Sequence, residues 1–476
     1  MKPSKITLLV AILMIGIVMS CKIQQPTSRD AKANLPGTYA GSSDSSATAS
    51  KSWRDLITDP YLRVLIDTAL ANNQEVNMLL QEIEIANTEM MERKGEYLPF
   101  VHIQAGAGMD KVGRYTRYGA LEHGVEIKPG EEFPEPFTDF QIGAVASWEL
   151  DIWKKLRNAK KSALLKYLAT VEGKNFMVTE LVSEITQNYY ELLALDNQLD
   201  ILNQNIEIQN SALQIVKLQK QAAKVTELAV KRFEAEVAKN QSLVFDLRQR
   251  IFEAENRIKF LTGSREMPVL RDAQAFMSAN LLDVKSGVPA QLLSNRPDIR
   301  QAELALQAAK IDVQVAKANF YPSLGLSAGL GVQAFQPGLL LTTPESLMYG
   351  LAGDLLAPLV NRNAIKARFY AANAKQMQAV LNYEQTVLSA FLEVKNQASR
   401  IQNLQGNFEQ KIKQVEALTE SINIANNLFK SARADYVEVL LTQREALESR
   451  MELIETKLSQ HLASISLYQA LGGGWR

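Results

Sequence analysis

Apolar and polar residues change their spacing several times along the 476-residue chain. A helical period of about 3.6 begins at Pro60, directly after the capping residues Thr58 and Asp59, and continues to about Lys94. From Val101 the period changes to two, with apolar side chains at alternate positions and polar or small side chains between them. This change predicts a helix that is followed by a strand with one apolar face.

The same succession of elements recurs in the second half of the chain. A second helix is predicted from Pro297, which follows Asn295 and Arg296, to about Ala318. An aromatic-proline segment ends both helices. The alternation predicts four strands, of which the last is the least regular, at about 97–118, 138–153, 320–333 and 346–360.

Each pair of strands is followed by a long stretch without proline. These stretches predict two helical hairpins, at about 154–262 and 362–470, whose first helices extend on the order of 100 Å. A short break separates the two helices of each hairpin. Thr226 and Asp435 are the predicted caps after these breaks, and Glu438 stands at the spacing of a capping box. Apolar residues at three- and four-residue steps in the last helix are typical of a coiled coil.

A helix, two strands and a hairpin therefore occur twice, at 53–264 and 289–471. A linker is predicted at 265–288, and a short tail at 472–476. We predict an internal two-fold repeat, in which the two copies share the order of their elements.

The N-terminus has the features of an export signal. Two lysines precede an apolar run from Ile6 to Met19, which at about 14 residues is too short to span a bilayer comfortably. The segment Val18-Met19-Ser20-Cys21 resembles the bacterial lipobox, and Cys21 is the only cysteine of the chain. We predict a signal peptide at 1–20, lipidation of Cys21 and a polar, lipid-anchored tether at 21–52. A plain signal peptide with an incidental cysteine is the alternative.

The alternating strands fit two environments. One is a half-buried antiparallel sheet in a soluble domain. The export signal favours the other, a transmembrane β-barrel, because strands of about 10 residues can cross a bilayer when tilted. No run of about 20 apolar residues is available to cross the membrane as a helix. Four strands cannot close a barrel alone, so a barrel requires several copies of the chain.

Composition argues against several other classes of function. Lys and Arg number 52, as do Asp and Glu, so the charge balance gives no reason to expect nucleic acid. One cysteine and three histidines leave little material for a Cys/His metal site. Glu149 and Asp151 have the parity of lumen-facing residues, and no base or nucleophile supports them as a catalytic pair. We expect solvated side chains there, no enzyme activity and no cofactor.

Four sequence segments resemble the motifs of one known family. They are Trp148–Ile152, Gly287–Glu303, Ala316–Pro322 and Tyr468–Trp475. In this order they resemble the TolC-type outer-membrane factor family, in its lipidated OprM- and NodT-like branch. The resemblance covers nearly the whole chain, from about Trp53 to Trp475.

The resemblance implies an α+β membrane protein that assembles as a homotrimer. Each copy would contribute four strands to a shared twelve-stranded barrel in the outer membrane. The long antiparallel coiled-coil helices would form a periplasmic tunnel, with a partly structured equatorial belt around 265–290 and parts of both chain ends. The implied partners are outer-membrane lipid, a periplasmic adaptor (membrane fusion protein) and an inner-membrane RND-type pump, which supplies the energy.

A tunnel that opens to the periplasm has to close when idle, and the helix tips are the place to close it. The resemblance places Val437 at a hydrophobic position of the constriction and Leu441 where an aspartate is usual. We therefore expect an apolar gate of Val437 and Leu441 that closes by dewetting, with Asp435 or Arg433 as substitute polar contacts. The alternative is that both apolar residues belong to the core of the coiled coil.

These features predict the outer-membrane channel of a tripartite efflux pump, which conducts its substrates passively. The exit duct of an ABC-driven type I protein secretion system has the same architecture and is one alternative. A structural periplasmic coiled-coil lipoprotein is another, but a structural rod needs no barrel.

Overall fold

The computed structural model describes residues 29–32, 35–39, 51–360, 362–431 and 433–475. The predicted signal peptide and Cys21 lie outside the described residues. The chain divides into two compact units, which are described separately. The first takes in Met91–Ala163 and Leu306–Leu381, and the second takes in Lys32–Met90, Leu164–Ala305 and Asn382–Arg476.

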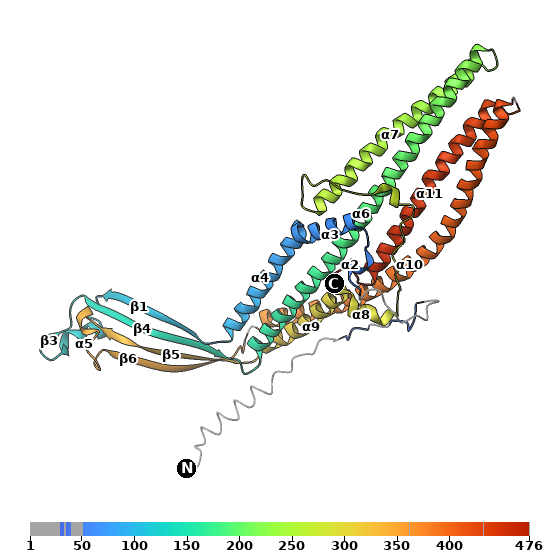
Figure 1. Cartoon of the computed structure of the whole chain (residues 1–476). Helices are drawn as coiled ribbons and strands as arrows, with labels where there is room; N and C mark the ends of the chain where they lie inside the picture. The colour runs from blue at the N-terminus through green and yellow to red at the C-terminus, as the bar shows by residue number, and fades with distance from the viewer. Residues whose placement is uncertain (1–28, 33–34, 40–50, 361, 432, 476) are drawn as a thin grey trace. The chain divides into compact units, whose positions relative to one another are not determined.

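The first unit contains a four-stranded antiparallel sheet in the order β1-β4-β5-β6 (Figure 1). Its strands are β1 (Phe100–Asp110), β4 (Phe137–Leu150), β5 (Ser323–Ala334) and β6 (Leu347–Leu356). The strands are shorter than the alternation predicted, most clearly β1, which was expected to reach residue 118. A turn follows β1 instead, and the Thr116 hydroxyl caps helix α5 (Arg117–Gly124) by accepting from the amide of Gly119 at 3.2 Å. Two short strands, β2 (Glu126–Lys128) and β3 (Glu131–Glu132), complete this connection.

The strand register gathers the apolar side chains on one face of the sheet. Ile103 pairs with Ala144, Ala144 with Leu330, and Leu330 with Tyr349, so a single apolar row crosses all four strands. In the single chain this face is open: Ile103 is 80% exposed and Tyr349 is 79% exposed. The opposite face is mostly polar or small, as the period of two predicted, but it also includes Phe100, Val145 and Met348.

Two glycines bring the middle strands unusually close together on the polar face. Gly143 of β4 pairs with Gly331 of β5. A Cβ atom on Gly143 would lie 2.8 Å from the carbonyl oxygen of Leu330, and one on Gly331 would lie 2.5 Å from that of Ile142. Side chains crowd one another on the concave side of a curved sheet, and glycine relieves the crowding there. The glycine pair therefore allows the sheet to curve towards its polar face.

Within the described ranges, seven longer helices make up most of what lies outside the sheet. The two hairpins appear in Figure 1 as antiparallel pairs that run side by side, α6 with α7 and α10 with α11. The helices are α3 (Pro60–Asn72), α4 (Gln74–Glu96), α6 (Lys155–Gln221), α7 (Glu227–Leu261), α9 (Pro297–Ala318), α10 (Asn363–Lys430) and α11 (Tyr436–Ala470). Two short helices, α2 (Trp53–Leu56) and α8 (Leu292–Asn295), precede α3 and α9. Across the described ranges, no helix combines the length and the apolar character needed to cross a membrane.

The helix predicted from residue 60 to about residue 94 is two helices, and Asn73 separates them. Its side-chain oxygen accepts from the amide of Val76 at 3.0 Å, which caps the start of α4. Its side-chain nitrogen donates to the carbonyl oxygen of Leu261 at the end of α7, at 2.9 Å. An asparagine side chain readily forms hydrogen bonds with nearby backbone groups, and here it ends one helix and starts the next. The spacing of the apolar residues is hardly changed at Asn73, so the sequence pattern does not reveal the break.

The main core of the second unit lies where α3, α6, α7 and α11 meet. Its fully buried side chains include Leu62, Ile185, Leu202 and Ile258. A separate cluster forms around Leu292, Ile299 and Val394, and Tyr39 belongs to it. Tyr39 stacks on Phe391 of α10, with ring centroids 5.7 Å apart. The polar tether expected at 21–52 therefore includes one aromatic residue that is packed into the protein.

Candidate functional site

The tip of the second hairpin is a short connection between α10 and α11. Asp435 caps α11, and its carboxylate accepts from the amide of Tyr436 at 2.6 Å. The amide of Glu438 donates to the backbone carbonyl of Asp435, at 3.2 Å. Arg433 is exposed, and its amide donates to the carbonyl of Leu428. The structure thus brings the two polar candidates, Arg433 and Asp435, to the same connection.

The apolar residues of this tip divide into two sets. Tyr436 and Leu440 pack against Phe233 and its neighbours, in a cluster that joins the two hairpins. Val439 is 3% exposed and continues the buried stripe. Leu441, by contrast, is 39% exposed and lies outside the described hydrophobic clusters. Val437 is half-buried and also lies outside them. Because residues four apart share a helix face, Val437 and Leu441 form a pair beside the packed stripe.

The tip of the first hairpin has a different chemistry. Lys220 pairs with Glu227, and Glu234 pairs with Lys217 at 3.2 Å and with Lys231 at 2.9 Å. Hydrogen bonds from Lys231 and Lys217 lower the pKa of Glu234. These pairs are exposed and screened, so they contribute little to stability. They make the first tip a charged surface, whereas the second tip presents two apolar residues.

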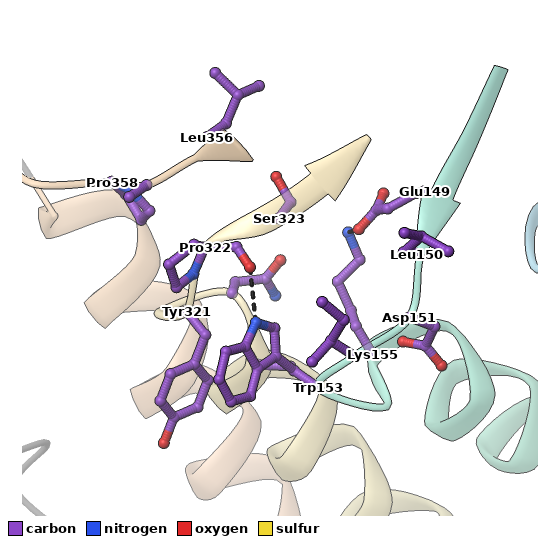
Figure 2. A pocket seen from close by; sticks show the side chains of 14 residues that line it. Glu149, Leu150, Asp151, Trp153, Lys155, Tyr321, Pro322, Ser323, Leu356 and Pro358 are labelled. Atoms are coloured by element: carbon purple, nitrogen blue, oxygen red, sulfur yellow. Dashed lines mark hydrogen bonds and ion pairs between the residues drawn. The ribbon is translucent and has the colours of Figure 1, made fainter. Parts of the chain in front are cut away.

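A cavity of about 360 Å³ with a mixed polar and apolar lining is found in the first unit, where the sheet joins the helices (Figure 2). The Trp153 ring stacks on Tyr321 with centroids 4.7 Å apart, and its indole nitrogen donates to the carbonyl oxygen of Pro322 at 2.7 Å. On the other side of the cavity, the Lys155 ammonium binds the Glu149 carboxylate at 2.5 Å. The contacts of Trp153 could not be predicted from the sequence, because its partners lie almost 170 residues away.

Asp151 is not the solvated residue that its strand parity suggested. Strand β4 ends at Leu150, and the Asp151 side chain is 2% exposed. Its two carboxylate oxygens accept from the amides of Leu156 and Arg157, both at 2.9 Å. An aspartate that binds the free amides at the start of a helix is a cap, and Asp151 caps α6. Glu149 keeps its predicted parity but is paired with Lys155.

The segment Asn295-Arg296-Pro297-Asp298 holds three helices together through the side chain of Arg296. Arg296 is 5% exposed and binds both oxygens of Asp298, at 3.0 and 2.6 Å. It also binds Glu393 of α10 at 2.7 Å and the carbonyl oxygen of Ala470 at 2.8 Å. A buried guanidinium with this many acceptors joins α9, α10 and α11. Over the ranges that the structure covers, no three His, Cys, Asp or Glu side chains are grouped as metal ligands.

Comparisons with known proteins agree with this architecture. The family model for outer membrane efflux proteins matches residues 65–264 and 288–473. The chain is 26% identical over 426 residues to the cation efflux system protein CusC of Escherichia coli O6:H1, a match that covers 89% of this chain and 88% of the relative. It is 25% identical over 476 residues to the probable outer membrane lipoprotein SilC of Salmonella typhimurium, with 98% of each chain covered.

The fold is also that of a solved channel. The open state of the Neisseria gonorrhoeae MtrE outer membrane channel superposes with a TM-score of 0.83 and 21% sequence identity, over 95% of this chain and 98% of that chain. The family model matches the chain on both sides of the segment between residues 264 and 288, and so includes both sets of strands and both hairpins. The chain belongs to the outer membrane efflux protein family.

Proposed function

We propose that three copies of this chain form the outer-membrane conduit of a tripartite efflux pump. Each copy contributes β1, β4, β5 and β6 to a closed twelve-stranded barrel, and its two hairpins to a periplasmic tunnel. Lipidated Cys21 anchors each copy in the outer membrane. A periplasmic adaptor and an inner-membrane RND-type pump deliver the substrate, and the pump supplies the energy.

The open apolar face of the sheet is the observation that carries this proposal. Ile103, Leu330 and Tyr349 lie on one exposed face of a sheet whose outer strands, β1 and β6, each have one unpaired edge in the single chain. Water would oppose such a face, whereas lipid accepts it. Lipid does not accept unpaired strand edges, so the edges have to pair with further copies. A periplasmic rod would need neither property.

Family membership supports efflux over the other uses of such a conduit. The names of CusC and SilC place these relatives in cation efflux and among outer membrane lipoproteins. The type I secretion duct remains the second candidate for the conduit. The two functions differ in cargo, because a secretion duct exports a protein and an efflux conduit exports small molecules or ions.

Val437 and Leu441 are proposed to close the periplasmic mouth. Leu441 is 39% exposed beside a stripe that is already packed by Tyr436 and Leu440. An exposed Leu441 beside a half-buried Val437, both outside the packed clusters, favours a dewetting constriction over a role in the coiled-coil core. Arg433 and Asp435, at the same connection, are proposed to make polar contacts around it.

Neighbouring positions of β1 provide a matched test of the conduit. Ile103→Lys places a charge on the proposed lipid face, where it costs about 2–4 kcal/mol at mid-membrane depth. Gln104→Lys places the same charge on the proposed lumen face. Cells that lack the wild-type gene are complemented with each variant, and dye efflux and heat-resistant trimers in isolated outer membranes are measured. Ile103→Lys should abolish both, and Gln104→Lys should retain both. Equal tolerance of the two changes would contradict the barrel.

A further inference from the structure

Basic residues gather at the starts of α6 and α10, the two helices that follow β4 and β6. Between Asp151 and Glu172 the sequence has six Lys or Arg residues and no Asp or Glu. Between Asp354 and Glu384 it has four Lys or Arg residues and again no Asp or Glu. The chain as a whole is balanced, with 52 residues of each sign. Positive charge is therefore concentrated where the sheet ends and the long helices begin.

Helix stability does not account for this distribution of charge. The start of a helix carries a partial positive charge and favours Asp or Glu. Helices α7 and α11 have Glu227 and Glu438 in their first turns, whereas α6 and α10 have no acidic residue there. The amides at the start of α6 already bind the Asp151 carboxylate. The basic side chains, which oppose the helix dipole, therefore point to a negatively charged partner of their own.

Lys155 shows which side of α6 continues the polar face of the sheet. Its ammonium binds Glu149, which shares a row with Gly325 and Asp354 on that face (Figure 2). Lys161 stands six residues later and is exposed. Because an α-helix turns by about 100° per residue, Lys161 lies about 240° around the helix from Lys155. It is therefore on the side of α6 that continues the apolar face of the sheet.

Three basic side chains make up a strip at the start of α6, which we call the basic strip: Lys154, Arg157 and Lys161. Lys154 and Lys161 are exposed, and within the described ranges neither forms an ion pair. The Arg157 side chain is 51% exposed and is positioned by Asp151 at 3.1 Å. Six residues of helix span about 9 Å, which is close to the roughly 5–8 Å thickness of one headgroup layer. The strip thus has the depth of a headgroup layer.

An aromatic residue lies between the apolar face of the sheet and the basic strip. Trp148 has the parity of Ile142 and pairs with Leu326 near the end of β4. The residue is 36% exposed, and its indole nitrogen donates to the carbonyl oxygen of Tyr97 at 3.1 Å. Tryptophan with an apolar ring surface and a satisfied nitrogen is typical of a membrane–water interface. Apolar face, aromatic residue and basic strip follow one another as acyl chains, interface and phosphate do in a phospholipid.

We infer that the basic strip binds the headgroups of anionic phospholipids in the leaflet of the outer membrane that faces the periplasm. The inference rests on the proposed barrel, in which the apolar face of the sheet contacts lipid. Lysine and arginine side chains lay their stems along apolar surface and hold their charges at the level of the headgroups. Phosphatidylglycerol carries a net negative charge there, whereas the choline of phosphatidylcholine offsets its phosphate. The strip therefore distinguishes the two lipids.

The test measures which lipids the full-length lipidated trimer retains. Trimers in detergent are mixed with equal amounts of phosphatidylglycerol and phosphatidylcholine that have the same acyl chains. They are then washed, and the retained lipids are counted by native mass spectrometry. After a wash at about 0.1 M salt, phosphatidylglycerol should be retained at least about threefold over phosphatidylcholine. The ratio should fall after a wash at about 1 M salt, because the Debye length shortens from about 10 Å to about 3 Å.

Three double variants show whether the basic strip causes this ratio. Lys154→Gln with Lys161→Gln removes the two unpaired charges and should bring the ratio close to one. Lys154→Arg with Lys161→Arg keeps the charges and should keep the ratio. Lys224→Gln with Lys413→Gln removes the same charge from exposed positions of the two hairpins and should also leave the ratio unchanged.

A further arm separates a lipid surface from a site for free phosphodiester anions. Glycerophosphoglycerol has the headgroup of phosphatidylglycerol without its acyl chains. In large excess it should leave the retained phosphatidylglycerol in place, because it has nothing to bury against the apolar face. Its displacement of the lipid would overturn the inference in favour of a site for the free anion.

The remaining outcomes separate this inference from the conduit itself. Equal retention of the two lipids, or a ratio that Lys154→Gln with Lys161→Gln does not change, overturns lipid binding by the strip and leaves the conduit standing. Loss of trimers in that variant, with the ratio unchanged in the trimers that remain, also overturns it and assigns the strip to contact with a neighbouring copy. Wild-type protein that forms no trimers and does not insert into vesicles overturns the conduit and the inference together.

Discussion

Arg296 binds the carbonyl oxygen of Ala470, the last residue of α11, at a distance of 2.8 Å. The contact joins the start of α9 to the end of α11, which lies more than 130 residues later in the chain. It also satisfies a carbonyl that has no partner within its own helix. The same guanidinium binds Asp298 and Glu393, so one side chain connects three helices.

Replacing Arg296 should therefore destabilise the second unit. Arg296→Met leaves Asp298 buried without its counter-ion, and we expect a loss of about 3 kcal/mol in the free energy of unfolding. Denaturant titration of the detergent-solubilised protein measures this loss. Arg54→Lys, in an exposed pair with Asp67, is the control and should change stability by less than about 1 kcal/mol. Similar losses in the two variants would show that the buried network of Arg296 contributes no more to the free energy of unfolding than an exposed ion pair.

The glycines after α11 should tolerate no side chain. Gly472 has φ +84°, and a Cβ there would lie 2.6 Å from the carbonyl oxygen of Asn295. Gly473→Ala would place a methyl group 2.1 Å from the Tyr468 ring. We expect Gly472→Ala and Gly473→Ala each to cost about 1–3 kcal/mol, measured as a lower thermal midpoint.

Gly406 is the matched control for these two changes. It lies within helix α10, and a Cβ there would meet no atom within 4 Å. Gly406→Ala should stabilise the protein by up to about 1 kcal/mol, because alanine is the better helix former. A destabilising effect of Gly406→Ala equal to that of Gly473→Ala would remove the steric explanation.

Leu441 offers a direct test of the proposed gate. Leu441→Ser replaces an exposed apolar side chain with a polar one, which removes the barrier to wetting. We expect single-channel recordings to show a larger conductance at rest. Leu441→Met retains an apolar side chain of similar volume and should keep the resting conductance low. If the serine variant is as closed as wild type, Leu441 is not part of a gate.

Protonation of His461 should make stability depend on pH. Burial and then the charge of Lys457 lower the pKa of His461 to about 3, and its ring stacks on Tyr190 at 4.2 Å. In the unfolded chain a histidine has a pKa of about 6.5, so below that pH the unfolded state binds a proton that the native state does not. Acidification through this window therefore destabilises the fold.

The expected slope is at most about 1.4 kcal/mol per pH unit, which is the linkage of one proton. Denaturant titrations between pH 6.5 and pH 5, where most carboxylates stay ionised, measure this slope. His461→Leu should flatten the slope in that range, even if it changes the stability at neutral pH. An unchanged slope would mean that another group takes up the proton.

Periodic features of the fold could be predicted from the sequence, because they repeat over many residues. The alternation located all four long strands and the face on which Ile103 lies, and the absence of proline indicated the long helices within a few residues. Features that depend on one side chain and a distant partner could not. Asn73 interrupts a helix by binding Leu261, and Asp151 leaves its strand to cap α6.

The candidate gate could be located by the resemblance but not weighed from the sequence. Both Leu440 and Leu441 fit the apolar stripe of the helix. Because they are adjacent, a shift of the stripe by one residue changes which of them packs against the neighbouring helices. Phe233 of the first hairpin packs against Leu440 and leaves Leu441 outside the cluster. The partners of Arg296 are also hidden in the sequence, since Glu393 stands 97 positions away.

The strand order β1-β4-β5-β6 also has a consequence for how a mutant allele behaves beside the wild-type allele. In the proposed barrel the two edge strands of a copy are different, so copies would join head to tail, with β6 of one copy beside β1 of the next. With an even number of strands per copy, the strands at this junction run antiparallel, like the others. A copy with a blocked β6 edge would still be accepted through its β1 edge and would then prevent closure. If the proposed trimer forms, such an allele should be dominant, because one defective copy of the three would leave the ring open.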